Sequence, residues 1–356
     1  MNPSPAFWAG KRVLVTGHTG FKGAWLALWL RQLGARVSGF ALEPDTRPNL
    51  FALAGLTETL EHAIGDLRDP DAVDKAVGQA RPDIIFHLAA QALVRRSYAQ
   101  PIATFATNVM GTAHLLEASR KSATVKAIVV VTSDKCYENR ELARPFVEGD
   151  PLGGHDPYSG SKACAEIVTA AYRDSFLAER RLAVASARAG NVIGGGDWAD
   201  DRLLPDCIRA FELGRKALIR NPRAVRPWQH VLEPLAGYLL LAEHLHRGDA
   251  RCASAFNFGP PEEDARPVSW LAGESARLWG DGATWAVDDR SHPHEAQMLS
   301  LDASKARKLL AWRPRLTLEE GLAWTVSWYR AVARGAMARQ ETLEQISRYA
   351  SAGTAR

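Results

Sequence analysis

A glycine-rich turn near the start of the chain constrains the fold more than any other stretch of the sequence. Gly17, Gly20 and Gly23 have the spacing G-x-x-G-x-x-G and lie between the apolar runs 12–15 and 24–30. Glycines placed after a strand and at the start of a helix allow a tight turn, close approach of backbone N–H groups to a pyrophosphate, and close helix packing. Such glycines alone can form a turn that binds nothing. Their position between a predicted strand and a predicted helix favours a dinucleotide site.

Strand and helix patterns alternate over the first half of the chain. The apolar runs are nearly continuous, which indicates strands buried on both faces of a parallel sheet with helices on either side. We therefore predict an α/β fold with a doubly wound parallel sheet of the Rossmann type. The predicted strands cover residues 12–16, 36–42, 61–65, 83–88, 126–133, 182–187 and 255–259, and predicted helices include 24–30, 70–79, 101–121 and the stretch from 158 to about 179.

Beyond residue 187 the alternation weakens, and short elements rich in proline, glycine, tryptophan and arginine replace it. We predict that residues 1–187 form the dinucleotide-binding domain, to which 228–258 return. Residues 188–227 and 259–335 are predicted to form a smaller mixed lobe, whose composition suits the binding of a nucleotide by stacking and charge. One or two helices are expected within 302–334. The polar, helix-prone segment 336–356 is predicted to be a peripheral tail.

Tyr158 and Lys162 are the first candidates for catalysis. On a helix their spacing places a phenol and an amine on one face, where the ammonium can lower the pKa of the phenol and let it take a proton from an alcohol. The pair alone is weak evidence, because amphipathic helices often contain it by chance. A second feature supports it: an apolar strand ends in Ser133, Asp134 and Lys135. Since ligands bind at the carboxyl ends of parallel strands, we expect these side chains to meet.

Composition and charge exclude several classes of function. The chain has 356 residues and a formal net charge of +4, with no basic block interleaved with aromatic residues, so nucleic-acid binding is not indicated. The four cysteines lack C-x-x-C spacing, which argues against a zinc site or disulfide framework and favours a reducing cytoplasm. His292-Pro-His294 is weak evidence for a metal, and none is predicted. Without a signal-like or membrane-spanning run, we expect a soluble protein that is not exported.

Five segments carry a resemblance that spans about residues 11 to 330. They are 17–23 (GHTGFKG), 132–137 (TSDKCY), 158–162 (YSGSK), 190–198 (GNVIGGGDW) and 226–231 (RPWQHV). They resemble the extended short-chain dehydrogenase/reductases and, more narrowly, the nucleotide-sugar 4,6-dehydratases of the CDP-glucose type. The resemblance implies NAD as cofactor, CDP-glucose as substrate and CDP-4-dehydro-6-deoxyglucose as product. It also implies a homodimer, or a higher oligomer built from dimers, paired through 101–121 and 158–179.

The resemblance implies a role for each of the catalytic candidates. Tyr158 as the phenolate takes the proton of the sugar 4-hydroxyl while a hydride leaves C4; Lys162 stabilises that phenolate, and Ser133 hydrogen-bonds the same oxygen. Asp134 is the acid that protonates the departing 6-hydroxyl, and Lys135 is the base at C5. The better-known dTDP-glucose dehydratases carry Asp-Glu at the positions of these last two residues. A lysine that only forms a salt bridge at a strand end is the alternative for Lys135.

By the same resemblance, two further groups of residues belong to the ligand sites. The cofactor residues are Gly17, Thr19, Gly20, Phe21, Lys22, Gly23, Asp66, Leu67, Leu88, Ala89, Ala90 and Asn108, together with Tyr158 and Lys162. The substrate residues are Gln91, Asn191, Trp198, Arg202, Arg226, Trp228 and His294. Arg202 and Arg226 are candidates for the pyrophosphate because a guanidinium fork matches phosphate oxygens, although many arginines are simply solvated. Asn108 is expected to support the active-site backbone.

The choice between NAD and NADP stays open on the residues themselves. An acidic side chain about twenty positions beyond the glycine turn would hold the adenosine ribose. Here Glu43 comes late, and the usual position is apolar. Arg47 is placed to meet a 2′-phosphate unless it is simply solvated. The resemblance implies NAD.

Several alternatives to a CDP-glucose dehydratase are compatible with these motifs. The substrate can be another nucleotide-sugar. An oxidoreductase would keep the cofactor site and release NADH, and an epimerase would need neither Asp134 nor Lys135. A non-catalytic NAD-sensing module is a fourth possibility, which the intact Ser133, Tyr158 and Lys162 disfavour.

Overall fold

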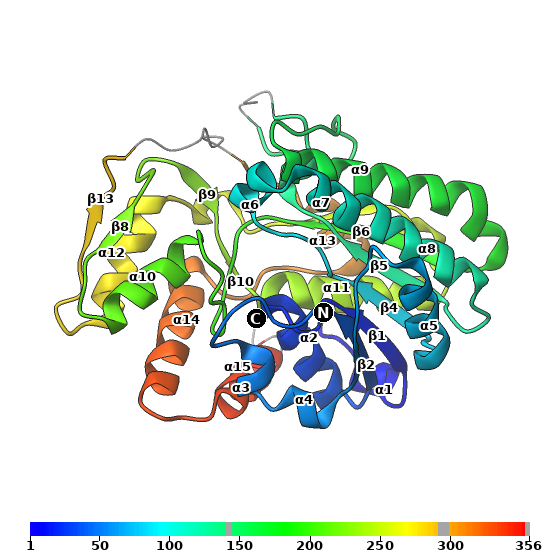
Figure 1. Ribbon diagram of the computed structural model, residues 1–356, viewed down its shortest axis with the longest axis horizontal. Helices are drawn as coiled ribbons and strands as arrows, with labels where there is room; N and C mark the ends of the chain where they lie inside the picture. The colour runs from blue at the N-terminus through cyan, green and yellow to red at the C-terminus, as the bar shows by residue number, and fades with distance from the viewer. Residues whose placement is uncertain (140–143, 291–298, 353–356) are drawn as a thin grey trace.

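The computed structural model describes residues 1–139, 144–290 and 299–352 (Figure 1). At its centre is a seven-stranded sheet in the order β11-β6-β5-β4-β1-β2-β3, in which all neighbouring strands are parallel. The strands are β1 (Arg12–Thr16), β2 (Arg36–Ala41), β3 (Glu61–Ile64), β4 (Ile84–His87), β5 (Ala127–Val131), β6 (Ala183–Ala189) and β11 (Ala255–Phe258). The predicted doubly wound α/β fold is confirmed.

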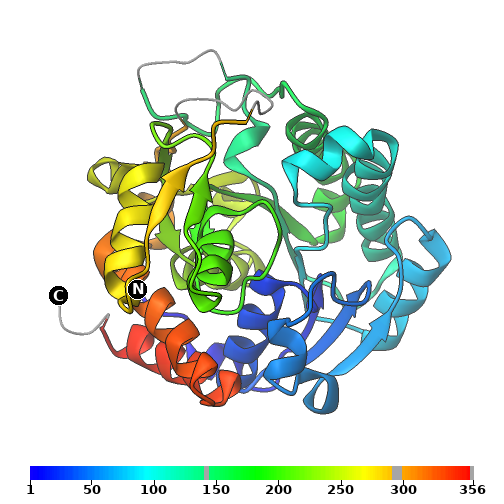
Figure 2. The same cartoon turned by 60° about the vertical axis from the view of Figure 1, so that its left-hand side comes forward.

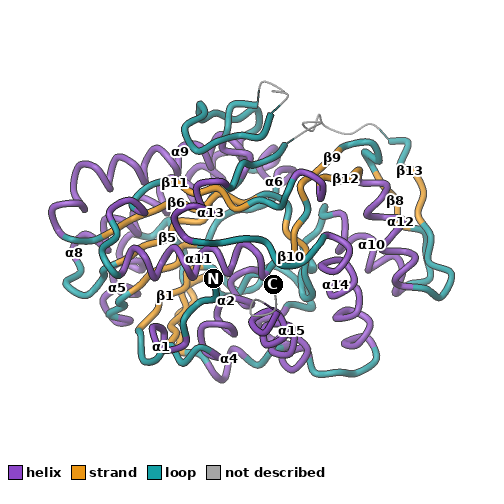
Figure 3. Tube along the Cα trace, turned by 180° about the vertical axis from the view of Figure 1, so that it is seen from behind, coloured by secondary structure: helices purple, strands orange, loops and turns teal. Residues whose placement is uncertain are grey.

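Alternate side chains of the central strands enter two different cores. Val13 and Val129 face a large core on one side of the sheet, whereas Leu14 and Ile128 face a second core on the other. Burial on both faces explains the continuous apolar runs of β4 and β5, which are buried at every position. Figure 3 shows α11 lying across the strands. The helices that cover the large core are α2 (Phe21–Gln32) and α11 (Leu232–His246). The helices that cover the second core are α5 (Pro70–Ala80), α8 (Gly111–Lys121) and α9 (Pro157–Tyr172).

The strand predicted over 126–133 ends earlier than expected, at Val131. Thr132 still donates its backbone N–H to Ala187 O at 2.9 Å. Ser133 then leaves the sheet, and its Oγ accepts the backbone N–H of Lys135 at 3.2 Å in the single 3₁₀ turn η2 (Asp134–Cys136). The residues predicted to end the strand therefore form a turn that carries side chains into the site.

The helix predicted over 101–121 is continuous but has an irregular middle turn. α7 (Pro101–Phe105) leads into the π-helical turn η1 (Ala106–Met110), which leads into α8. Asn108 lies in this wider turn and is buried. Single π-helical turns often occur at functional sites, which is consistent with a place for Asn108 near the site.

In the described residues, the smaller lobe contains paired short strands and longer helices. The strand pairs are β7 (Val192–Ile193) with β10 (Gln229–His230), β9 (Val225–Pro227) with β12 (Ala265–Pro267), and β8 (Ala217–Ile219) with β13 (Trp285–Val287). The helices are α10 (Leu203–Glu212), α12 (Val268–Trp279) and α14 (Leu318–Ala333). Trp228, Trp279 and Trp328 belong to the same core as α2 and α11. The lobe and the sheet thus share a core, and the predicted domain boundaries remain a prediction.

The C-terminal segment is a packed helix, contrary to the expected peripheral tail. α15 (Ala338–Ala352) lies against α2 and α14, and Figure 2 shows this red helix beside the blue N-terminal segments. Ile346 and Tyr349 are fully buried, and Tyr349 Oη donates to Oε2 of the buried Glu233 at 2.7 Å. The expectation was wrong because polar residues dominate this helix, while its buried face is only a narrow stripe.

The remaining helical elements are short. They are α1 (Pro5–Trp8), α3 (Leu50–Leu53), α4 (Leu56–Thr59), α6 (Val94–Ala99), α13 (Ser304–Leu310), η3 (Arg173–Leu177), η4 (Ala178–Arg180), η5 (Ala250–Cys252) and η6 (Glu262–Asp264). Within the part of the chain that the structure describes, no helix has the length and apolarity needed to cross a bilayer.

Candidate active site

A cavity of about 660 Å³ lies between the sheet and the smaller lobe. Its wall includes residues that follow β1, β4 and β5, together with residues of α9, β7 and α10. Ligands of open α/β sheets bind at this carboxyl edge. Every predicted site residue lines the cavity except two: Asn108 is buried behind the wall, and His294 lies outside the described residues.

The glycine turn fits the pyrophosphate of a dinucleotide. Gly17 has a φ of +78°, and a Cβ added to it would lie 2.7 Å from the backbone N of Ala89. A Cβ added to Gly23 would lie 2.1 Å from Gly17 O, so neither position accepts a side chain. α2 begins directly after Gly20, which provides no side-chain cap. The first backbone N–H groups of α2 therefore stand at the cavity wall as donors for phosphate.

The segment after β2 favours a dinucleotide without a 2′-phosphate. Glu43 and Asp45 line the cavity, whereas Arg47 borders an adjoining hollow of about 440 Å³. Thr19 Oγ1 donates to Leu42 O at 2.9 Å and so holds this segment against the glycine turn. Asp45 is paired with Arg96 at 2.6 Å, so the Glu43 carboxylate is the group here that would repel an additional phosphate.

Asn108 supports the cavity wall instead of lining it. Its Oδ1 accepts the backbone N–H of Gln91 at 2.8 Å, and its Nδ2 donates to Gln91 O at 3.0 Å and to Ser161 Oγ at 2.8 Å. The side chain is 2% exposed, because it lies behind the loop that contains Gln91. The expected support of the active-site backbone by Asn108 agrees with these hydrogen bonds, and its assignment to the cofactor site remains a prediction.

His87 is a buried polar residue of this region that was not predicted from the sequence. Its Nδ1 lies 2.7 Å from Thr16 Oγ1, and its Nε2 lies 3.1 Å from Thr112 Oγ1. Burial lowers the pKa of His87 to about 3, so the ring is neutral. Thr16 Oγ1 also accepts the backbone N–H of Ala89 at 3.3 Å. The ring thus links β1, β4 and α8 to the wall beside the glycine turn.

Ser133, Tyr158 and Lys162 are all buried and line the same cavity. Tyr158 is in the first turn of α9, whose start is capped by the Asp156 side chain. Lys162 follows one turn later, and its Nζ donates to Val131 O at 3.2 Å, which ties the helix to the end of β5. Hydroxyl, phenol and amine therefore come together from a strand end and a helix.

Burial dominates the protonation of the phenol and the amine. Burial raises the pKa of Tyr158 to about 12, against an opposing effect of Ser133. Burial lowers the pKa of Lys162 to about 8, against an opposing effect of Glu166. The predicted lowering of the phenol pKa by Lys162 is thus outweighed in the protein alone and remains a prediction. A positively charged ligand beside the phenol would favour the phenolate.

Asp134 and Lys135 add an acid and a second amine to this group. Ser133 Oγ donates to Asp134 Oδ1 at 2.9 Å. Asp134 is 3% exposed, and burial raises its pKa, with Lys135, Ser133 and Arg226 acting in the opposite direction. A carboxyl with a raised pKa is biased toward the neutral form, which can donate a proton. Lys135 is half-buried and lines the cavity.

A buried ion pair beneath these residues was also not predicted. Arg188 Nη2 lies 2.7 Å from Glu166 Oε2, and the two side chains are 4% and 3% exposed. Glu166 also accepts hydrogen bonds from Ser186 Oγ at 2.6 Å and Thr132 Oγ1 at 2.5 Å. Arg188 Nη1 donates to Tyr137 Oη at 2.8 Å. Because Thr132 and Tyr137 flank the turn after β5, the network fixes that turn relative to α9.

Five of the seven predicted substrate residues line the lobe side of the wall, and Gln91 lines it from the sheet side. The five are Asn191, Trp198, Arg202, Arg226 and Trp228. Arg202 Nη1 lies 2.9 Å from Asp197 Oδ2, which directs one side of the guanidinium. Trp228 is 8% exposed, and its indole N–H has no partner in the described parts of the chain. An unpaired buried donor at a cavity wall is a site where a ligand acceptor can bind.

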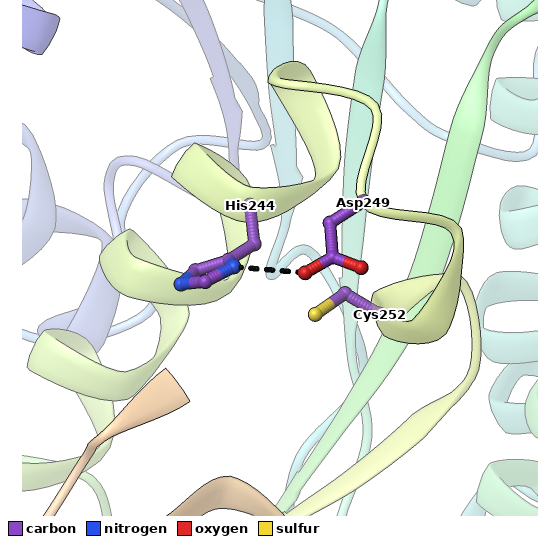
Figure 4. Close-up of side chains that lie close together, drawn as sticks. All are labelled: His244, Asp249 and Cys252. Atoms are coloured by element: carbon purple, nitrogen blue, oxygen red, sulfur yellow. Dashed lines mark hydrogen bonds and ion pairs between the residues drawn. The ribbon is translucent and has the colours of Figure 1, made fainter. Parts of the chain in front are cut away.

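One group of side chains outside the cavity has metal-ligand chemistry. Within the described residues, His244, Asp249 and Cys252 place one ligand atom each within 4.8 Å of one another (Figure 4). Arg251 already binds both oxygens of Asp249, at 2.9 Å and 2.8 Å, and His244 Nδ1 lies 3.3 Å from Oδ2. These hydrogen bonds account for the closeness of the three side chains, which lie at the C-terminal end of α11 and just after it.

The sheet, the glycine turn and the convergence of Ser133, Tyr158 and Lys162 define the class of the extended short-chain dehydrogenase/reductases. The family model described as GDP-mannose 4,6 dehydratase matches residues 14–325. The chain belongs to this family of nucleotide-sugar dehydratases. The resemblance inferred from the sequence motifs is confirmed.

Individual relatives support the same placement. The chain is 50% identical over 353 residues to a CDP-glucose 4,6-dehydratase of Salmonella typhimurium, with 98% of each chain covered. A double mutant of DesIV, a dTDP-glucose 4,6-dehydratase of Streptomyces venezuelae solved with NAD, is 26% identical, with a TM-score of 0.74 and coverage of 90% and 97%. A UDP-glucose 4-epimerase of Thermotoga maritima, solved with UDP-glucose, has a TM-score of 0.79 at 23% identity, with coverage of 90% and 99%. This last likeness shows the fold alone.

Proposed function

We propose that the protein is an NAD-dependent hydro-lyase that converts CDP-D-glucose to CDP-4-dehydro-6-deoxy-D-glucose by internal transfer of a hydride from C4 to C6. The observation that carries this proposal is the presence of Ser133, Asp134, Lys135, Tyr158 and Lys162 in the wall of one cavity. The 50% identity to a CDP-glucose 4,6-dehydratase over nearly the whole chain supports the reaction and the substrate.

The first step requires an oxidant and a base at the sugar 4-position. NAD, which the glycine turn and the start of α2 would hold, would supply the hydride acceptor for C4 and the hydride donor for C6. Tyr158 takes the proton of the 4-hydroxyl, with Ser133 as a hydrogen-bond partner of the same oxygen. Lys162, held at Val131, keeps a positive charge near the phenol when protonated. The ketone that results makes the hydrogen on C5 acidic.

The second step removes water and uses the pair after Ser133. Asp134 is buried and biased toward its neutral form, so it is suited to protonate the departing 6-hydroxyl. Lys135 borders the same cavity and is proposed as the base that removes the C5 proton. An amine must be neutral to accept a proton, and the neutral form of Asp134 removes the ionised carboxylate that would otherwise hold Lys135 in its charged form.

The lobe is proposed to hold the nucleotide. Arg202 and Arg226 offer guanidinium groups to the diphosphate, together with the half-buried Asn191. Trp228 offers an unpaired indole N–H, and Trp198 an aromatic face. His294 is proposed as a further substrate contact on the basis of the family resemblance.

Two other reactions are possible on the same scaffold. A reductase or dehydrogenase would release NADH, and an epimerase would invert a sugar carbon without an acid and a base after Ser133. The buried Asp134, hydrogen-bonded to Ser133 at 2.9 Å, favours the dehydratase because neither alternative needs it.

A panel of nucleotide-glucoses tests the proposal. Purified protein is incubated separately with CDP-, dTDP-, UDP- and GDP-glucose, and the products are examined for the alkali-induced absorbance of a 4-keto sugar. We expect CDP-glucose to be converted fastest, without net formation of NADH. Equal conversion of dTDP-glucose would contradict the cytidine preference, and stoichiometric NADH would identify a dehydrogenase.

We also propose that the protein is a homodimer, or a higher oligomer built from dimers. Apolar side chains are exposed along α7 and η1, where Ile102 is 81% and Met110 51% exposed, and along α9 and η3, where Ile167 is 56% and Phe176 50% exposed. α7 and η1 lie directly against α9. We call this surface the α7–α9 face, and a second copy of the chain would remove it from water.

The location that we propose is the cytoplasm. All four cysteines are free, and three of them are buried. Unpaired thiols are typical of proteins that stay in a reducing compartment.

A further inference from the structure

Lys22 is a charged side chain in the wall of the cavity, on the first turn of α2. The turn it follows binds phosphate through backbone N–H groups, so this purpose does not require the lysine side chain. Its Nζ donates to Tyr238 Oη at 3.3 Å and lies 5.4 Å from the centre of the Tyr238 ring. Lys22 is therefore anchored at the cavity wall and does not extend into solvent.

Tyr238 is a rigid partner for this amine. It is completely buried in α11, and its ring packs edge-on against Phe258 with 5.5 Å between the ring centres. Burial raises the pKa of Tyr238 strongly, and Tyr158 and Asp134 act in the same direction. The phenol is thus neutral and accepts the hydrogen bond from Lys22. The pair lies within electrostatic range of the catalytic phenol.

Positive charge accumulates at this end of the cavity. Burial, together with the charges of Arg202 and Lys162, lowers the pKa of Lys22 to about 7, and Asp134 acts in the opposite direction. Burial raises the pKa of Asp134, the carboxyl that faces these cations, and so weakens the negative charge that opposes them. Just below neutral pH most Lys22 side chains carry a proton.

The reacting end of the nicotinamide must come close to these groups. One alcohol loses its O–H proton to Tyr158 and its C–H hydride to the cofactor, so the acceptor has to lie beside the same carbon. The oxidised ring carries one positive charge, and the reduced ring carries none. Cations nearby therefore raise the free energy of the oxidised form relative to the reduced form.

We propose that Lys22, held by Tyr238, biases the bound nicotinamide toward its reduced state and so helps it to accept the hydride. The inference rests on the proposed NAD-dependent function and adds a residue to it. In the step concerned, the C4–H bond breaks, the electron pair moves with the hydrogen to the nicotinamide, and the O4–H proton moves to Tyr158. The sugar is oxidised by two electrons and the nicotinamide reduced by two. Lys22 acts only through its charge.

The test measures cofactor binding without any nucleotide-sugar. Holoenzyme is equilibrated at pH 6.5 with a fixed mixture of NAD⁺ and NADH, free cofactor is removed, and the bound forms are released and separated by chromatography. Lys22→Met should lower the bound NADH to NAD⁺ ratio about tenfold relative to wild type. Lys22→Arg should keep the ratio within about twofold, because it keeps the charge. Lys216→Met, which removes an exposed lysine of the lobe, should leave it unchanged.

A second variant tests the anchor. Tyr238→Phe keeps the ring and removes the hydroxyl that binds Lys22, so it should shift the ratio in the same direction by a smaller factor. A Lys22→Met variant with the wild-type ratio, or one that loses both cofactor forms equally, overturns the proposal. No sugar is present in this experiment, so a shifted ratio supports the role of Lys22 even where CDP-glucose proves not to be the substrate. Turnover of CDP-glucose together with an unshifted ratio rejects the role of Lys22 and leaves the proposed function intact.

Discussion

At the scale of single residues, burial decides which groups of the site can exchange protons. It raises the pKa of Tyr158 to about 12 and lowers that of Lys162 to about 8. The protein alone therefore keeps the phenol protonated near neutral pH. A positively charged ligand is needed to shift it toward the phenolate, which couples the base to the oxidised cofactor. Burial also raises the pKa of Asp134, which favours its protonated form.

The base assignment of Lys135 gives the first prediction. Lys135→Met removes the amine but keeps the length of the side chain, so the variant should still bind CDP-glucose and NAD and still oxidise C4. Exchange of the C5 hydrogen with solvent deuterium, followed by mass spectrometry of the recovered sugar, should slow at least about a hundredfold.

Two comparisons make that result specific. Tyr158→Phe should lose both oxidation at C4 and exchange at C5, because the C5 hydrogen becomes acidic only after the ketone has formed. Lys121 is an exposed residue of α8 that pairs with Asp74, and Lys121→Met should leave both the oxidation and the exchange unchanged. Exchange close to the wild-type rate in Lys135→Met would remove Lys135 from the role of base.

At the scale of elements, Glu233 joins α11 to the C-terminal helix. Its Oε2 accepts from Tyr349 Oη, and its Oε1 accepts the backbone N–H groups of Arg315 and Leu316 at 2.9 Å and 2.8 Å. Burial raises the pKa of Glu233 to about 7, and these hydrogen bonds act in the opposite direction. The carboxyl thus titrates near neutral pH inside the fold.

This titration gives a stability prediction. Above the ordinary Glu pKa of 4.5 the unfolded chain releases a proton that Glu233 still holds in the folded protein. The contribution of this proton to the free energy of unfolding is therefore complete below pH 4.5 and is lost as the pH rises to about 7. Glu233→Gln should lose less stability than wild type between pH 4.5 and 8, by about 2 kcal/mol in urea unfolding. Glu344→Gln, at an exposed position of α15, should behave as wild type. An identical loss in Glu233→Gln and wild type would contradict this account.

The elements also show how far the sequence alone determines the structure. All seven strands of the central sheet were predicted, and the inner ones such as β4 and β5 were clear because strands buried on both faces are nearly continuous apolar runs. The glycine turn was equally clear, since Gly17 and Gly23 exclude any side chain. The burial of α15 was missed, because its contacts to α2 and Glu233 join residues more than 100 positions apart.

Within the site the same distinction holds. Tyr158 and Lys162 could be predicted because they lie one turn apart on one helix, and Ser133 because it closely follows a recognisable strand. The Glu166–Arg188 pair and the link through His87 could not, because each depends on partners from several strands and helices. The supporting role of Asn108 was expected from the family resemblance, but its partner, the backbone of Gln91, was not.

At the scale of the whole molecule, the site exists because a shared core joins the sheet and the lobe. Trp228 borders the cavity and belongs to the core that contains α2 and α11. Most of the predicted cofactor residues in the wall follow strands of the sheet or lie on α2 and α9, and most of the predicted substrate residues belong to the lobe. Nucleotide-sugar binding is thus expected to stabilise the contact between the two parts.

The proposed homodimer is a property of the whole molecule and gives a further prediction. Sedimentation at micromolar concentration should show a species of at least twice the monomer mass. Ile102→Glu with Ile167→Glu should convert it to monomers, because the two changes place charges in the α7–α9 face. Leu213→Glu, at a residue of the lobe that is 65% exposed, is the matched control and should remain associated. A monomeric wild type rules the dimer out.

The central claim is that one protein molecule moves a hydride from C4 to C6 of its substrate without net consumption of cofactor. CDP-glucose labelled with deuterium at C4 tests this most directly, with the product examined by NMR and the solution by absorbance for NADH. The account predicts deuterium in the C6 methyl group of the 4-keto product and no accumulation of NADH. Deuterium that stays at C4 of an epimerised sugar, appears in released NADH or is lost to solvent would contradict it.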